Sequence, residues 1–229
     1  MKILFTLVLL LSLPACGDSA DSKYFPLKQQ QLLTYHKQLT RSDGSFENKF
    51  LIRITGPESI AGKQLYLQQT ASGISALLER NDDGIYQVGS TQHGEHSLNA
   101  TPVMIMPIPL TVGSRWQTLT QTELLEWRKY SLEKIDRGLR IKLPMDYHCT
   151  KLDARIITPA GNFQNVAVIK GYAERRMEFT GDTGFIVIKI DSTQWYAPGI
   201  GLIKSERTES VDRREINPGE SVTVLERID

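Results

Sequence analysis

Apolar and polar residues alternate with a period of two along most of the chain, which is typical of half-buried β-strands. The clearest example lies between residues 33 and 54. Residues 33–39 alternate large and polar side chains, Ser42-Asp43-Gly44 predicts a turn, and residues 46–54 run back. Asp-Gly supplies the positive φ angle that a tight hairpin turn needs. We therefore expect an antiparallel hairpin, with Gly56-Pro57 ending its second strand.

The same alternation recurs between turn signals along the rest of the chain. The further strands that it predicts are residues 63–70, 74–80, 85–88, 139–143, 154–157, 163–169, 185–190, 201–208 and 222–227. Residues 116–125 and 126–134 could be two long strands or one strand and a short helix. Roughly a dozen strands exceed what one flat sheet tolerates without curling or splitting. The sequence therefore predicts an all-β, antiparallel fold with little helix, built as a curved sheet, an open barrel or a sandwich.

Three stretches depart from this pattern. Residues 91–101 are polar and contain Gly94, which predicts a loop. Residues 103–110 are strongly apolar, but their two prolines lack the N–H that a paired strand donates, so we expect a buried extended segment. Residues 121–134 fit either strand or helix, and the pattern leaves both open.

A short sequence pattern that occurs twice bears on the domain organisation. Pro26-Leu27 and Pro109-Leu110 each precede, at the same spacing, a large apolar residue that opens a run of strands: Leu33 in one case and Trp116 in the other. This repeated pattern suggests two related halves with a break near residues 91–108. Two matches this short can easily arise by chance, so a single domain without duplication is the leading interpretation and two related halves are the alternative.

The N-terminus reads as an export signal. Lys2 precedes an apolar run over residues 3–13, followed by Pro14-Ala15-Cys16. The run is shorter than the ~20 residues that a membrane-spanning helix needs. With a cysteine at the cut site the pattern resembles the bacterial lipobox, although Pro14 is unusual there. Ordinary cleavage near Ala15, leaving Cys16 as a free thiol, is the alternative.

The lipobox interpretation divides the chain into three parts. Residues 1–15 form a lipoprotein signal peptide, residues 16–23 form the lipidated Cys16 with its palmitate-type acyl chains and a flexible polar tether, and residues 24–229 form a single β-rich periplasmic domain. Gly17 follows the cysteine, where an aspartate would favour inner-membrane retention. We therefore expect the outer membrane, with the domain facing the periplasm.

The composition of the chain limits the partners and the cross-links that we expect. The net charge is +1 and 40% of the residues are apolar, so no basic face for nucleic acid is expected. Cys149 is the only cysteine besides Cys16. If Cys16 carries lipid, no intramolecular disulfide can form, and we expect Cys149 to be buried as a small apolar residue.

Four segments carry a resemblance to a known group of proteins. They are Tyr24-Phe25-Pro26-Leu27, Pro109-Leu110-Thr111-Val112-Gly113-Ser114-Arg115-Trp116, Thr158-Pro159-Ala160-Gly161-Asn162-Phe163-Gln164-Asn165 and Trp195-Tyr196-Ala197-Pro198-Gly199-Ile200-Gly201-Leu202-Ile203-Lys204. In this order they resemble an uncharacterised family of bacterial secreted or lipid-anchored β-rich envelope proteins. In the first segment Gln30 and Leu33 depart from the family pattern, while Tyr35 fits it. The resemblance implies an antiparallel β-fold at the cell envelope and brings no catalytic residues.

The candidates for chemistry are few. His93 and His96 lie three residues apart, and His148 precedes Cys149. Zinc needs three or four such ligands at ~2.0 to 2.3 Å, and nothing in the sequence brings residue 93 near residue 148. A solvated loop is the simpler interpretation, and no Gly-x-Ser-x-Gly nucleophile motif is present. We therefore expect no catalytic residues, no metal and no cofactor.

The leading hypothesis is a lipid-anchored envelope β-domain with a non-enzymatic binding or assembly role. Its partners are the membrane, through the lipid, and an unknown envelope protein or an apolar ligand. Residues able to line a ligand groove are Trp116, Trp127, Trp195 and Tyr196, for each of which core packing is the alternative.

Each version of this hypothesis predicts a different structure. An apolar ligand predicts a cavity of ~300 to 1,000 Å³. An assembly role predicts an exposed apolar patch or an unpaired strand edge. The competing hypothesis, an envelope hydrolase or metal-dependent enzyme, predicts that His93, His96 and His148 converge.

Overall fold

The computed structural model describes residues 23–27, 30–42, 44–70, 73–127, 138–178 and 184–229. The predicted signal peptide, Cys16 and the tether up to residue 22 lie outside this part of the chain. Within it there are fourteen β-strands and no helix. The described residues accordingly hold no helix able to cross a membrane.

The strands make one large antiparallel sheet and one small one. Their bounds are β1 Leu32–Arg41, β2 Gly44–Ile60, β3 Lys63–Thr70, β4 Ile74–Arg80, β5 Gly84–Gln92, β6 Glu95–Pro107, β7 Arg115–Gln121, β8 Glu126–Trp127, β9 Lys142–Thr158, β10 Gly161–Glu178, β11 Phe185–Ala197, β12 Gly201–Val211, β13 Ile216–Asn217 and β14 Gly219–Ile228. Twelve of them form a sheet in the order β6-β5-β4-β3-β2-β1-β14-β12-β11-β10-β9-β7, and β8 pairs with β13. This confirms the predicted all-β antiparallel fold.

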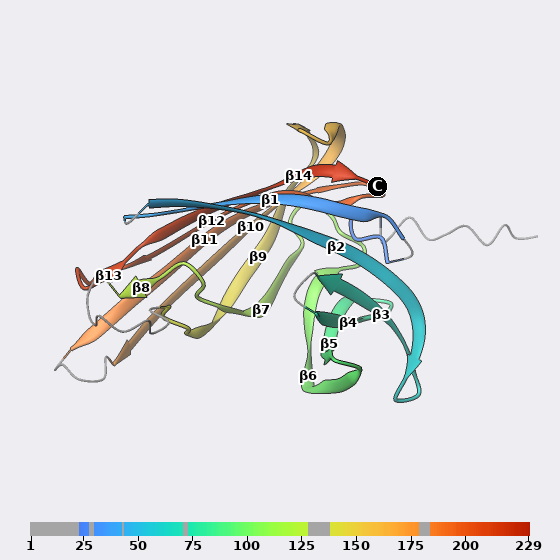
Figure 1. Cartoon of the computed structure of the whole chain (residues 1–229), viewed down its shortest axis with the longest axis horizontal. Helices are drawn as coiled ribbons and strands as arrows, with labels where there is room; N and C mark the ends of the chain where they lie inside the picture. Colours follow the sequence, from blue (N-terminus) through green and yellow to red (C-terminus); the bar gives the residue numbers. More distant parts are fainter. Residues whose placement is uncertain (1–22, 28–29, 43, 71–72, 128–137, 179–183) are drawn as a thin grey trace, which may run out of the picture.

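The large sheet curls until its two ends nearly meet (Figure 1). The first and last strands pair in its middle, with Tyr35 of β1 opposite Leu225 of β14. The two edge strands, β6 and β7, follow one another in the chain but are not hydrogen-bonded to each other. The sheet is therefore an open barrel, and its opening lies between two consecutive strands.

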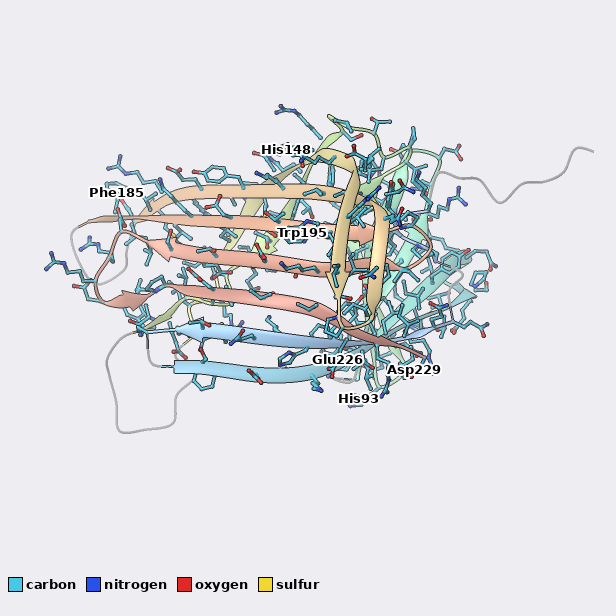
Figure 2. The ribbon with its side chains drawn as sticks, turned by 90° about the horizontal axis from the view of Figure 1, so that it is seen from above. His93, His148, Phe185, Trp195, Glu226 and Asp229 are labelled. Atoms are coloured by element: carbon cyan, nitrogen blue, oxygen red, sulfur yellow. The ribbon has the colours of Figure 1, made fainter. Side chains whose placement is uncertain are left out.

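The long hairpin of β9 and β10 bends away from the barrel wall. Its register shifts at three places between Phe163 and Ile169, and such bulges bend a strand pair. Figure 2 shows the end of the hairpin crossing over the sheet near Trp195. Ala154, Ile156 and Phe163 of this end pack against a buried cluster that includes Leu33, Tyr35 and Leu225.

The prediction that Gly56-Pro57 ends the second strand is wrong. β2 continues to Ile60, and its register with β3 shifts between Thr55 and Glu58. Gly56 has a φ of +113°, and a Cβ atom there would lie 2.9 Å from the carbonyl oxygen of Leu65. The glycine therefore allows the strand to bulge past its neighbour and continue.

The prediction of a loop at residues 91–101 is also wrong. His93 and Gly94, with φ angles of 51° and 84°, make a tight turn, and β6 starts at Glu95 opposite Gln92. Residues 95–101 are exposed, and Leu98 is their only large apolar residue, so the sequence carries little of the alternation that marks a half-buried strand. Their strand conformation comes from pairing with β5 rather than from burial.

The ambiguous region is non-helical as far as it is described. β7 ends at Gln121, and Glu126 and Trp127 form the short β8. Residues 128–134 lie outside the described part of the chain. Several predicted strands also prove too short: residues 154–157, for example, belong to the 17-residue β9.

Side chains fill the barrel interior from both ends. At the start of β7, the N-terminal segment (residues 23–27) enters the core with Tyr24, Phe25 and Leu27 buried. At the end of β7, residues 121–127, which we call the crossing segment, run along the inner face of the sheet with Leu124 and Leu125 buried. Cys149 is 1% exposed, which confirms its predicted burial.

Candidate functional site

The opening between β6 and β7, which we call the seam, contains a cleft of about 380 Å³. One wall comes from β5 and β6, and the other from β7 and β9. The lining residues are Gln87, Asn99, Ala100, Thr101, Val103, Leu119, Thr120, Gln121 and Lys142. The cleft therefore lies where the two edges of the sheet face each other.

Hydrogen bonds at both ends of the β7–β9 ladder show which residues of β7 are bonded to β9. At one end the Cys149 N–H donates to the Ser114 carbonyl over 2.9 Å, and at the other the Thr122 N–H donates to the Ile141 carbonyl over 2.9 Å. The register between these points is continuous, without a bulge. Bonded and non-bonded pairs alternate along an antiparallel ladder, so the even-numbered residues of β7 face β9.

The odd-numbered residues of β7 therefore turn their backbone toward the seam. Among the described residues, no hydrogen bond to the backbone of Gln117 or Leu119 is found. The outward carbonyl of Gln121 accepts from Nη2 of Arg207 at 2.8 Å. With respect to the described part of the chain, β7 thus presents two consecutive outward positions whose N–H and C=O groups have no partner.

The opposite edge is irregular. Gln87 pairs with Val103 and Gly89 with Leu98, so four residues of β6 stand opposite Val88 alone. The side chain of Asn99 donates to the Gln87 carbonyl across this bulge, at 3.4 Å. Pro102 and Pro107 lack a backbone N–H. Bulges and prolines are the usual means of blunting a strand edge, so β7 is the edge better able to pair.

A buried ion pair holds the end of β7 in place. Glu209 of β12 is fully buried, and its carboxylate accepts from Nε of Arg207 at 2.7 Å and from the backbone N–H groups of Glu123 and Leu124 at 2.9 to 3.0 Å. Arg207 also donates from Nη1 to the Thr120 hydroxyl at 3.1 Å. These bonds link β12 to the crossing segment through the interior of the barrel.

The chemistry of the cleft is mainly that of amides and hydroxyls. Lys142 is exposed, and no carboxylate of the described residues lies within salt-bridge distance of its ammonium group. Leu119 is 63% exposed and contributes an apolar side chain at the rim. The cleft can therefore bond a polypeptide backbone, contact an apolar side chain and attract a negative charge.

Of the four predicted groove aromatics, Trp116 and Tyr196 pack in the same buried cluster, whereas Trp127 and Trp195 pack against two other clusters. Trp116 stacks on Tyr147 with ring centroids 5.5 Å apart, inside the core cluster next to the N-terminal segment. Trp127 packs on a second cluster near the crossing segment. Trp195 lies near the bent hairpin, with Nζ of Lys204 4.9 Å from its ring centroid.

Tyr196 lines a small apolar cavity. This cavity of about 90 Å³ is bordered by Phe25, Tyr35 and Leu202 as well. Burial raises the pKa of both the Tyr35 and the Tyr196 hydroxyl. The Tyr35 hydroxyl donates to the Leu202 carbonyl at 2.7 Å, so it serves the packing of the barrel.

The three histidines do not converge. His93 lies in the β5–β6 turn and His96 in β6, whereas His148 lies in β9, and Figure 2 places His93 and His148 on opposite sides of the molecule. No group of three or more His, Cys, Asp or Glu residues in the described part of the chain could hold a metal ion. The convergence that the metal-enzyme alternative predicted is therefore absent from these residues.

The segments that carried the family resemblance are packing elements. Tyr24, Leu110 and Tyr196, one from each of three segments, belong to a single buried cluster. The Gly199 N–H donates to the Lys23 carbonyl at 2.7 Å, which joins the N-terminal segment to the β11–β12 turn. Burial raises the pKa of the Tyr24 hydroxyl, and the nearby Cys149 adds to this shift.

The sequence analysis did not identify the seam as a site. Its β6 wall lies in the stretch interpreted as a loop, and the unpaired state of β7 depends on where distant strands pair. The one available signal was the pair of prolines at positions 102 and 107, which is typical of an edge strand.

The comparisons with known proteins give little help. No protein-family model matches the sequence, and no curated protein matches it. Two solved structures are similar: a "putative exported protein with YmcC-like fold" from Bacteroides fragilis and a "putative lipoprotein" from Parabacteroides distasonis. They are 16% and 15% identical, with TM-scores of 0.35 and 0.36, and each match covers 90% of this chain and 98% of the other. Similarity at this level carries no argument about the present chain.

Proposed function

We propose that this chain is a lipid-anchored protein of the cell envelope with a non-enzymatic binding or assembly role. The observation that carries the assembly role is that β6 and β7 face each other across the seam, each with an edge that no other strand of the described residues pairs with. An unpaired edge is a template for pairing with another chain, and proteins normally cover or blunt it. Here β6 is blunted and β7 is not.

The N-terminal geometry supports the tether. Tyr24 is 2% exposed, so the chain enters the core directly after the polar stretch that follows Cys16. From Cys16 to Lys23 an extended chain spans at most about 25 Å, at ~3.5 Å per residue. Lipidation at Cys16 would therefore hold the end of the barrel that contains Lys23 close to the membrane, which we propose to be the periplasmic face of the outer membrane.

The apolar-ligand variant has less support. The apolar cavity beside Tyr35 and Tyr196 has about 90 Å³, well below the ~300 Å³ at which small-molecule sites begin. The space that a carrier would leave open is taken by the side chains of the N-terminal and crossing segments. We therefore favour assembly over transport of a ligand.

The test compares the wild-type chain with Cys16→Ser in cells. Labelled palmitate should enter the wild type and not the variant, and only the wild type should fractionate with outer membranes on a density gradient. Equal membrane association of the variant would contradict the lipid anchor.

A second measurement tests the assembly role. Mild cross-linking of intact cells, followed by extraction of the full-length lipoprotein, should yield a species larger than its monomer. A monomer alone would contradict an assembly role, whatever the outcome for the anchor.

A further inference from the structure

We propose that the seam binds one extended polypeptide segment of a partner protein, which pairs as an added strand with β7. This inference rests on the proposed binding role and names the chemistry of the partner. The backbone of Gln117 and Leu119 faces the seam and has no hydrogen-bond partner among the described residues. An extended peptide is the ligand whose alternating N–H and C=O groups match such an edge.

The walls of the cleft favour an isolated segment over a second copy of this chain. β7 is flanked across the cleft by β5 and β6, which supply five of its nine lining residues. A strand that is already part of another barrel would bring its own neighbouring strand into this space. A single extended segment has no such neighbour, so it can enter between the two walls.

The side chains of the seam specify the segment further. Leu119 and Gln117 are exposed on the same face of β7, because side chains two apart share a face. An apolar residue of the segment that lies beside Leu119 would cover its exposed side chain. Lys142 favours an acidic residue in the bound peptide, at the end that lies nearer the crossing segment of this chain (residues 121–127). The expected ligand is thus an extended stretch with an apolar residue and a nearby carboxylate.

Proline substitution at position 119 tests backbone pairing directly. Because the Leu119 N–H points away from β9, Leu119→Pro removes a donor from the seam and leaves the β7–β9 ladder its bonds. Leu119→Ala is the matched control, since it shortens the side chain and keeps the donor. Thermal melting of both variants verifies that the barrel is intact.

The probe is a phage-displayed library of random 12-residue peptides, selected on the full-length lipoprotein in detergent. We expect selected peptides to be rich in apolar and acidic residues and to bind with an affinity that Leu119→Pro lowers at least tenfold. Leu119→Ala should lower it only a few-fold. Methylating alternate backbone nitrogens of the peptide should abolish binding.

Two results would overturn the proposal. The first is that no peptide is selected, or that selected peptides bind folded Leu119→Pro as well as the wild type. The second is a dimer in light scattering that Leu119→Pro dissociates, which would make a second copy the occupant. If the cross-linked species of the cell experiment persists in Leu119→Pro, the assembly role stands and only this site fails.

Discussion

Arg207 donates from Nε to Oε1 of Glu209 at 2.7 Å, and the pair lies inside the barrel with Glu209 fully buried. Both residues belong to β12, two positions apart, so they share the inward face of the strand. Their remaining bonds reach the end of β7 and the crossing segment. One buried pair therefore sets the position of the strand edge on which the proposed site depends.

Removing one member of this pair should cost much stability. Glu209→Ala leaves the Arg207 guanidinium without its carboxylate, and the N–H groups of Glu123 and Leu124 without an acceptor. We expect a loss of roughly 3 to 5 kcal/mol in the free energy of unfolding, measured by urea denaturation. The matched control is Glu206→Ala, on the same strand, whose partner Lys204 is more exposed. That variant should lose about 1 kcal/mol or less, and equal losses would contradict the assigned role of Glu209.

The N-terminal segment should contribute as a packed part of the core. Tyr24 donates from its hydroxyl to the Asn165 carbonyl at 3.0 Å. Tyr24→Phe removes this bond and should cost about 1 kcal/mol, whereas Tyr24→Ala should cost roughly 3 to 5 kcal/mol. Gln30→Ala, at an exposed position a few residues further along the chain, serves as the control. If Tyr24→Ala unfolds at the same urea concentration as the control, the segment is not part of the stable core.

Stability should fall at alkaline pH. Burial raises the pKa of the Cys149 thiol above its ordinary value of 9.0, and it raises those of Tyr35 and Tyr196 above 10.0. As the pH rises through these ordinary values, the unfolded chain loses its protons first, so the stability present below pH 9.0 declines.

The measurement is the urea midpoint as a function of pH. Cys149→Ala should flatten its decline just above pH 9.0, while the later decline due to the tyrosines remains. A wild-type midpoint that stays constant from pH 8 to 11 would argue against these buried groups remaining protonated in the folded state.

A methyl group on Gly219 should displace the crossing segment. A Cβ atom there would lie 2.7 Å from Cβ of Leu124 and 2.8 Å from its carbonyl oxygen. Both contacts are too close, so we expect Gly219→Ala to lower the free energy of unfolding by about 1 to 3 kcal/mol. The adjacent Glu220→Ala, at an exposed position, should change it little. If Gly219→Ala has the same free energy of unfolding as the wild type, the crossing segment packs less tightly against β14 than described.

Local pattern was enough to predict the strands that are half buried and bounded by turns. Residues 63–70 and 74–80 were predicted with the bounds that β3 and β4 have. In β3, Leu65 and Leu67 are buried between polar neighbours, so the alternation is visible in the sequence. Residues 95–101 are exposed throughout, and their strand could not be predicted because Leu98 is the only large apolar residue in it.

The candidate site was less predictable because it depends on long-range pairing. Consecutive strands are neighbours from β1 to β6, but β6 and β7 are not hydrogen-bonded to each other. The pairing of β1 with β14 decides which strands become edges, and no local pattern reports it. The burial of Glu209 could not be predicted for a similar reason. In the sequence it is one charged residue in a polar run, and only its even spacing from the buried Ile203 indicates that it faces inward.

Amide hydrogen exchange of the free protein, resolved by residue, tests the open seam most directly. The account predicts alternation along β7, with slow exchange at Trp116, Thr118 and Thr120, whose N–H groups are bonded to β9, and fast exchange at Gln117 and Leu119. Uniformly slow exchange across all five amides would mean that the edge of β7 is already paired. That result would contradict both the open barrel and the strand-accepting site.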